Sequence, residues 1–503
     1  MIKLNKYLLI IIIMIITIKN EDLKNGTYII NKPGLYKLVE DIIFHPNPDN
    51  NFQPKEDQSL KYPKNKGYVL GFFAAFVFET EDIIFDLNGF TIQCSKQFNL
   101  KQRFFSLIEL ASTPFIPKQG PANFGDSIIF AKNCVIKNGI LGLTPHHGIH
   151  GNGMSNIQIK NLLFREYEVA GISLNGGKNI IIEKCKLCGT SQDVKMVSSY
   201  SQCHFGLPFL KKIVAKDPNL LVNINSGSKT IQQIYDDVEN EIKKFDNYVL
   251  HGGKYKGIFK NKSKIMDDNV YGIALNSMGV LVNNFKNLRN EETIGNENIY
   301  LKNIIIENTV SKPIEIPGLF KNQENPNGND AYGKNEYVGP VGDVFDFTQC
   351  MDENGYYKED VLGNMQLAIA MYGKEQSERG TCNIDEFLCN TWITGYDINL
   401  KELCNNGTYY IVNGQDSMGH VMKGNIGLFI SQGLNINVEN IIIDGVINLG
   451  KTKDTNSSQA VGIAICGSKD VNIKNKLIKN IKSSNSDEEK IKLINLNENI
   501  NIY

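Results

Sequence analysis

A short pattern of apolar and polar positions recurs along the chain. Residues 156–161 (Asn-Ile-Gln-Ile-Lys-Asn) are followed 23 residues later by the similar stretch 179–184 (Asn-Ile-Ile-Ile-Glu-Lys). A glycine followed by an apolar residue stands eight positions before each Asn or Asp of the pattern, in the pairs Gly148/Asn156, Gly171/Asn179, Gly427/Asn435 and Gly462/Asp470. Because apolar residues alternate with period two, the pattern predicts short strands that each bury one face.

The repeated unit reads Gly-φ-x-φ, a polar turn, Asn or Asp, and φ-x-φ, where φ is apolar. We expect the glycine to allow a bend and the Asn or Asp to occupy a left-handed turn. Strands this short at a repeat of about 20–25 residues must stack on the next copy to bury their faces. Identical residues then form ladders, with Ile on Ile inside and Asn on Asn at the corners. The predicted fold class is all-β, a parallel β-helix.

Two insertions interrupt the repeat, which otherwise extends from residue 21 to 482. Residues 205–250 contain a predicted helix over 230–245, with a start signal at Ser228 and Thr230 and apolar residues at helical spacing. Residues 311–410 contain a second predicted helix over 359–372 and a cluster of cysteines. Long insertions in a solenoid fold over one face, which is often the binding face. Residues 483–503 are predicted to be a C-terminal cap or a disordered tail.

The N-terminus has the layout of an export signal. Two lysines within residues 1–6 precede an apolar run over 7–18, which is typical of a secretory signal peptide. Twelve residues are short for a spanning helix, which needs about 20. We therefore predict a signal peptide over 1–20 and a secreted or surface-exposed protein, with a retained signal anchor as the alternative.

Export affects how the ten cysteines are interpreted, because disulfides form in oxidising compartments. Cys382, Cys389 and Cys404 follow Cys350 closely, as in an insertion that is cross-linked by disulfides. Cys185, Cys188 and Cys203-His204 could be taken for zinc ligands, but the second half lacks the usual ligand spacing, so disulfides are the preferred interpretation. Four Asn-x-Ser/Thr sequons predict glycosylation at Asn25, Asn261, Asn406 and Asn456.

The charge of the chain excludes one class of partner. With 53 basic and 54 acidic residues the net charge is −1, whereas a nucleic-acid binder needs a basic face to neutralise phosphates. The abundance of Asn and Ile is partly explained by the repeat, since these residues fill its corners and strands.

The repeat resembles the right-handed parallel β-helix superfamily, which contains the pectate lyases and polygalacturonases. Residues 82–92 and the Gly-φ…Asn-φ-x-φ units carry the resemblance, and residues 26–30 and 33–38 are similar to the opening strands of secreted β-helices. The resemblance covers about 25–200, 250–310 and 411–480. It implies a right-handed helix and, in an enzyme, a polysaccharide substrate.

Candidate catalytic residues lie close to the template glycines. His146, His147 and His150 form the densest histidine group of the chain. The other candidates stand a few residues before a template glycine and are Arg165, Glu166, Glu168, Asp267, Asp268 and, for substrate binding, Lys423. Asn175 and Asn276 follow equivalent strands and are further substrate-binding candidates. If these residues share a phase, they form one strip along the stacked coils, although polar residues before a strand are more often solvated turns.

The strip would suit a polysaccharide. Two carboxylates on adjacent coils could act as acid and base in glycoside hydrolysis. In a lyase, carboxylates would instead hold Ca²⁺ against a uronate while Arg or Lys removes a proton. No cofactor is otherwise expected, and a histidine metal site is disfavoured because neighbouring side chains on extended chain point to opposite sides.

The resemblance transfers no complete active site. Polygalacturonases carry Asn-x-Asp, Asp-Asp, Gly-His-Gly and Arg-x-Lys motifs in successive coils. This chain has Asp267-Asp268 and Ile149-His150-Gly151 in the wrong order and lacks a convincing Arg-x-Lys. The main hypothesis is therefore an exported β-helix that binds polysaccharide in a lateral groove and, if it is an enzyme, cleaves it there. The alternatives are a non-catalytic structural or adhesive surface protein of a virion or cell coat, and a glycan epimerase.

Overall fold

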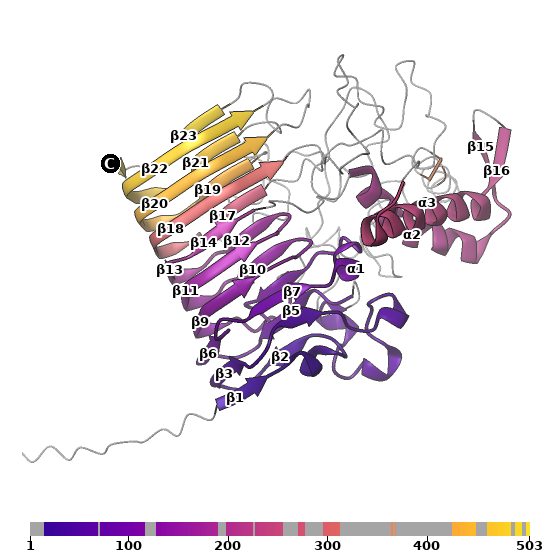
Figure 1. Ribbon diagram of the computed structural model, residues 1–503, viewed down its shortest axis with the longest axis horizontal. Coiled ribbons are helices and arrows are strands. Elements are labelled where there is room, and N and C mark those ends of the chain that lie inside the picture. Colours follow the sequence, from indigo (N-terminus) through magenta and orange to yellow (C-terminus); the bar gives the residue numbers. More distant parts are fainter. Residues whose placement is uncertain are drawn as a thin grey trace, which may run out of the picture.

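The computed structural model describes residues 15–68, 71–115, 127–189, 198–224, 227–254, 270–276, 295–311, 364–365, 368, 425–448, 460–483, 488–494 and 499–503. Within these residues the chain is mainly β and forms two large parallel sheets (Figure 1). Nearly every pass of the chain adds one strand to each sheet, so that the strands lie in register as a stack. This arrangement is compatible with the predicted parallel β-helix.

The first sheet has 13 strands among the described residues. In spatial order its main path is β1 (Ile15–Ile18), β3 (Gly34–Leu38), β6 (Ile83–Asp86), β9 (Lys132–Leu141), β11 (Ser155–Arg165), β13 (Lys178–Glu183), β18 (Glu297–Ser311), β20 (Leu434–Asn448), β22 (Lys469–Ser483) and β24 (Ile500–Ile502). Three short strands pair beside this path, namely β4 (Ile42–Phe44), β7 (Thr91–Cys94) and β14 (Lys186–Cys188).

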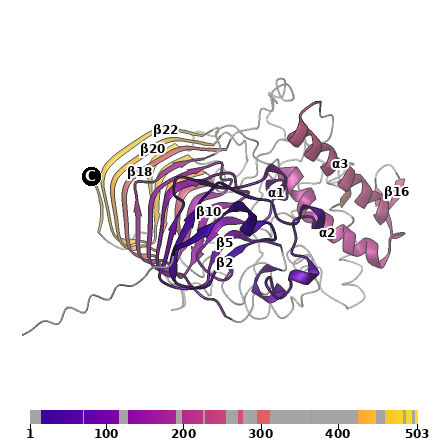
Figure 2. The ribbon, with the colours of Figure 1, turned by 60° about the horizontal axis from the view of Figure 1, so that its bottom comes forward.

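The second sheet has nine strands in the described part of the chain. They are β2 (Tyr28–Ile30), β5 (Ala74–Phe78), β8 (Ser106–Glu109), β10 (His147–Asn152), β12 (Ala170–Asn175), β17 (Val270–Asn276), β19 (Asn425–Ser431), β21 (Ala460–Cys466) and β23 (Glu488–Ile494). Turning the molecule shows the strands of both sheets nested as successive layers (Figure 2).

Asparagine corners bend the long strands of the first sheet. In β18, Asn298, Asn303 and Asn308 have φ values of 57°, 55° and 54°, in the left-handed region. Asn tolerates this region better than most residues, so one Asn in every five bends the strand without a glycine. The prediction that Asn occupies left-handed corners is confirmed, and each corner repeats in the neighbouring coils.

The corner asparagines form the predicted ladders. The Nδ2 of Asn156 donates to Oδ1 of Asn133 (2.8 Å), and Asn179 donates in the same way to Asn156 (2.9 Å). The ladder continues to Asn298, which donates to Asn179 (3.1 Å), and to Asn435, which donates to Asn298 (2.7 Å). Each amide thus bonds its counterpart one coil away.

The template glycines have a different role from the one predicted. Gly148, Gly171, Gly272, Gly427 and Gly462 do not have positive φ, so no bend requires them. A Cβ on Gly427 would instead lie 2.7 Å from the carbonyl oxygen of Gly462 and 2.7 Å from Cγ2 of Ile443. The glycines are needed because the coils approach each other too closely there for a side chain.

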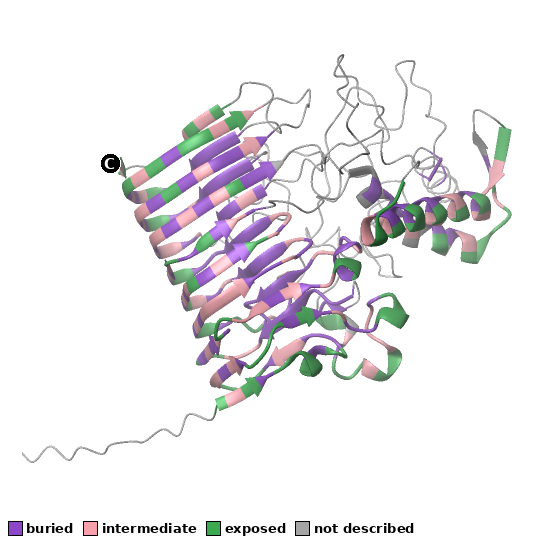
Figure 3. Cartoon of the chain, in the orientation of Figure 1, coloured by how far each residue is buried: buried purple, intermediate pink, exposed green. Residues whose placement is uncertain are grey.

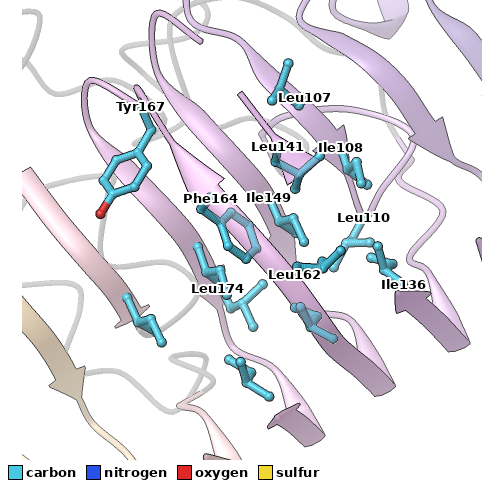
Figure 4. Close-up of a cluster of buried hydrophobic side chains, with 14 of the residues drawn as sticks. Leu107, Ile108, Leu110, Ile136, Leu141, Ile149, Leu162, Phe164, Tyr167 and Leu174 are labelled. Carbon is cyan, nitrogen blue, oxygen red and sulfur yellow. The ribbon is translucent and has the colours of Figure 1, made fainter. Parts of the chain in front are cut away.

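Apolar ladders fill the space between the sheets (Figure 4). Ile157, Ile180, Ile299 and Ile436 pair in register along the first sheet, and all are at most 1% exposed. Full burial of one such side chain is worth about 1.5–3 kcal/mol. Along the first sheet, strand residues alternate between buried and more exposed positions, whereas β10, β12, β19 and β21 of the second sheet are buried along their whole length (Figure 3).

Helices of the first insertion lie to one side of the stack (Figures 1 and 2). They are α2 (Ser198–Lys216) and α3 (Ile231–His251), joined through the hairpin of β15 (Leu221–Ile224) and β16 (Gly227–Thr230). The start signal is confirmed, because the Thr230 hydroxyl accepts a hydrogen bond from the Gln233 amide and caps α3. The predicted helix over 359–372 lies almost wholly outside the described residues.

Short helices complete the described elements. They are α1 (Lys96–Asn99) and the 3-10 helices η1 (Asn20–Leu23), η2 (Pro48–Asn50), η3 (Glu56–Gln58) and η4 (Lys64–Lys66). None of the described helices has the length and apolar character needed to cross a membrane.

Candidate functional site

Three of the predicted residues, His146, His147 and His150, meet on the outward side of the second sheet. The apolar residues Ile108, Ile149 and Ile172 stack in register on β8, β10 and β12 and point into the core. Because neighbouring strand residues point to opposite faces, His150 points away from the core, between its register partners Glu109 and Ser173.

His150 and Glu109 form a buried pair. The Nδ1 of His150 lies 2.8 Å from one Glu109 carboxylate oxygen and 3.0 Å from the other, and the Ser106 hydroxyl donates to the same carboxylate at 3.1 Å. His150 is 2% exposed and Glu109 is fully buried. A buried carboxylate needs such donors, so this pair and Ser106 satisfy one another.

The other nitrogen of His150 faces an amide ladder. Its Nε2 lies 3.2 Å from Nδ2 of Asn175, which makes Nε2 the acceptor and places the ring proton on Nδ1, toward Glu109. Asn175 also donates to Asn152 (2.8 Å) and accepts from Asn276 (3.0 Å). The two predicted substrate-binding asparagines are thus neighbours in one ladder of this network.

His146 and His147 pack beside this pair. Nδ1 of His146 lies 3.0 Å from Nδ1 of His147, and the His147 ring stacks on that of His150 with centroids 4.9 Å apart. The ring of Phe104 contacts all three histidines. Burial lowers the pKa of His146 to about 3 and that of His147 well below its ordinary value, and His150 lowers both further by repulsion.

Glu168 lies in a separate cluster, against the helical insertion. It accepts hydrogen bonds from the side-chain amides of Asn99 (2.9 Å) and Gln102 (3.3 Å). Nearby, the hydroxyl of Tyr200 on α2 contacts the Asp246 carboxylate on α3 and donates to the Leu100 carbonyl at 3.1 Å. Burial and the carboxylate of Asp246 raise the pKa of Tyr200 well above its usual value, which favours a structural hydroxyl.

The remaining candidates do not join the histidines. Arg165 is exposed at the end of β11, in the first sheet, and Glu166 occupies a left-handed corner with φ of 56°. His147 and His150 lie on β10 of the second sheet, whereas Arg165 ends β11 and Glu166 occupies the corner that follows, and the strip as a whole stays a prediction. Asp267, Asp268 and Lys423 lie outside the described residues. So do Asn261, Asn406 and Asn456, whereas Asn25 is exposed at a turn.

Sequence reasoning missed Glu109, Ser106 and Phe104. These residues lie in and before β8, whose coil lacks the Gly…Asn template, and Glu109 is 41 positions from His150. One signal could have found the carboxylate, because Glu109 interrupts the apolar stretch Leu107-Ile108-Glu109-Leu110. A charged residue in such a strand usually has a buried partner.

The chemistry of the described cysteines is also clear. Cys94, Cys134, Cys185 and Cys188 are not joined to one another in disulfides, and the disulfides preferred for Cys185, Cys188 and Cys203 stay a prediction. Burial raises the pKa of Cys134 to about 11 and that of Cys185 to about 12, which makes both unreactive. Cys350, Cys382, Cys389 and Cys404 lie outside the described residues, and their pairing stays a prediction.

A metal centre was tested on the same residues. In the part of the chain that the structure describes, no three His, Cys, Asp or Glu side chains gather as metal ligands. The histidine group bonds within itself and to Glu109, an arrangement that can hold an imidazole in one tautomer and orientation.

Comparisons with known proteins give no family assignment. No protein-family model matches the chain, and no curated protein sequence matches it significantly. Among solved structures, the chain is similar to PfbA, a surface adhesin of Streptococcus pneumoniae, with 10% sequence identity and a TM-score of 0.21 over 94% of this chain and 86% of that one.

Proposed function

We propose that the chain is a non-catalytic structural or adhesive protein of an exported or surface location, built on a right-handed parallel β-helix. One observation carries the proposal. Of the histidines that the sequence singles out as catalytic, His147 and His150 are buried and His146 is half-buried, and His150, 2% exposed, bonds Glu109 and Asn175. A general base must reach its substrate within hydrogen-bond distance, and an enclosed imidazole does not.

The acidic candidates support the same proposal. The Glu168 carboxylate is engaged by the side-chain amides of Asn99 and Gln102, in and just after α1. Cleavage of a glycosidic bond needs two carboxylates that face the sugar from opposite sides. The described candidates, Glu166 and Glu168, are instead a corner residue and a bonded residue on one short stretch of chain.

The solvent-facing side of the first sheet fits a surface role. Opposite charges face each other across neighbouring coils, with Lys178 3.0 Å from Glu297 and Lys302 3.2 Å from Glu439. Such exposed pairs add little stability, at most about 1 kcal/mol each. If the strands paired in a shifted register, like charges would face each other, and this would disfavour that register. The face is therefore regular, charged with both signs and rigid, as suits contact with a glycan or protein surface.

A glycan panel tests the proposal. The secreted protein would be incubated with neutral and acidic polysaccharides while retention and the release of reducing or unsaturated ends are measured together. We expect retention without new chain ends. The triple variant Glu166→Gln, Asp267→Asn, His150→Gln should attach as well as the wild type, provided that circular dichroism shows it folded. Chain ends produced by the wild type and lost in the triple variant would establish an enzyme instead.

A further inference from the structure

A short cover closes the outward side of β10. It consists of Phe104 and of residues 112–115, which flank β8 on either side. The Phe104 ring lies 4.5 Å from that of His146 and 4.8 Å from that of Phe115, and the Pro114 carbonyl accepts a hydrogen bond from Nδ2 of Asn152 at 2.9 Å. The histidine pair is thus packed beneath an aromatic ring.

The rings of His146 and His147 are in direct contact, with centroids 4.2 Å apart and planes nearly perpendicular, which disfavours a charge on both. Nδ1 of His146 lies 3.0 Å and 3.2 Å from the two ring nitrogens of His147. If both imidazoles were protonated, all four ring nitrogens would be donors and two would face each other. The closed arrangement therefore favours at least one neutral ring, and burial favours two.

The cluster around this pair contains the carboxylate of Glu109, which is already engaged. His150 stacks on His147 from the same strand, and Glu109 on β8 is already bonded to His150 and Ser106. From the next coil, Val169 and Ala170 contribute backbone amides that donate to the His146 carbonyl. Phe104, Pro114 and Phe115 of the cover carry no charge.

We propose that this pair is an acid-sensitive lock, in which protonation of His146 and His147 releases the cover and exposes the amide ladder of Asn152 and Asn175. The inference goes beyond the proposed function and holds whether or not the protein is an enzyme. It concerns a local opening, because the ladders elsewhere in the stack contain no such pair among the described residues.

The direction of the effect follows from linkage. The pKa of His146 is about 3 when the cover is closed, whereas an open imidazole titrates near about 6.5. The closed state therefore binds fewer protons, so its advantage is complete above about pH 6.5 and falls as the pH drops toward 3. Between pH 7 and 4.5 the opening constant should rise about 100-fold if one histidine responds and about 10⁴-fold if both do.

Hydrogen exchange measures the opening. The amides of His147 and Ala170 bond the carbonyls of Phe105 and His146, so their exchange reports release of this corner. After correction for intrinsic exchange rates, peptides with these amides should gain exchange in acid, while peptides from β20 and β22 should not. Equal gains in all peptides would mean global unfolding, and no gain above pH 4.5 would mean no lock; either result overturns the proposal.

Variants identify the responsible groups. His146→Asn with His147→Asn should flatten the pH dependence, and each single variant should reduce the slope of its logarithm by about half. His251→Asn, on the exposed end of α3, serves as the matched control and should leave the slope unchanged. If the double variant does not fold, the two single variants decide, and an unchanged slope in both overturns the proposal.

Discussion

Removing Glu109 distinguishes a structural histidine network from a catalytic one. In Glu109→Ala, Nδ1–H of His150 loses the acceptor that lies 2.8 Å away, and the Ser106 hydroxyl loses its partner at 3.1 Å. All of this occurs where Glu109 is fully buried and His150 is 2% exposed. Deleting one member of a buried pair costs about 3–5 kcal/mol, because the other member stays buried without compensation.

The matched variant Glu109→Gln keeps the shape and one acceptor. Its carbonyl can still accept from His150, and its amide can donate to the Ser106 hydroxyl, so we expect a loss of about 1 kcal/mol. Replacing both partners, as in Glu109→Leu with His150→Phe, should recover much of the Glu109→Ala loss, because no unpaired charge remains.

Urea unfolding followed by far-ultraviolet circular dichroism gives the free energies. The midpoint should fall in the order wild type, Glu109→Gln, Glu109→Ala, with an unchanged slope. If Glu109→Ala differed from the wild type by less than about 0.5 kcal/mol, as exposed substitutions do, the buried pair would not have the role assigned to it.

Three further predictions concern the stack. In the same assay, Asn298→Ala should lower the free energy of unfolding by about 1–2 kcal/mol, because alanine is strained at a left-handed φ and the ladder bonds are lost. Asn298→Gly should lose only the ladder bonds. Equal losses in the two variants would assign the effect to the ladder alone. Gly427→Ala should destabilise by about 1–3 kcal/mol, since its Cβ would meet the next coil at 2.7 Å, and a neutral result would contradict the close packing. The predicted signal peptide over 1–20 includes β1, which pairs with β3 and whose Ile18 is fully buried. Amino-terminal sequencing of the secreted protein should therefore find an earlier start, no later than Ile15, and a start after residue 20 would show that β1 is dispensable.

The ladders can be predicted from the sequence where the repeat has a constant length. They cannot be predicted where an insertion separates two coils, because the spacing between equivalent residues then changes. Asn156 and Asn179 are 23 positions apart and can be aligned by eye. The next ladder bond joins Asn179 to Asn298 across 119 positions, and the one after joins Asn298 to Asn435 across 137. Register across such distances is set by the stacking itself, which places Asn298 on Asn179 and Ile299 on Ile180.

The role of the glycines could not be derived from the chain alone. A glycine repeated at the same place in successive coils could allow a bend in the chain or a close approach between two coils. The two differ only in what lies opposite the missing side chain, which for Gly171 is the carbonyl of Gly272, at 3.1 Å from an added Cβ. That carbonyl belongs to a coil 101 positions further on, after the first insertion.

The candidate site shows why a local density of histidines is weak evidence for catalysis in a stacked fold. Successive coils place register partners about 4.8 Å apart, so any polar residue on a covered face meets another polar residue directly above or below it. Glu109, His150 and Ser173 are such partners, and the asparagine ladder beside them follows the same rule. Burial then obliges these groups to satisfy each other. A carboxylate–imidazole pair can therefore arise from stacking alone, and its enclosure, rather than its composition, decides between a structural and a chemical role.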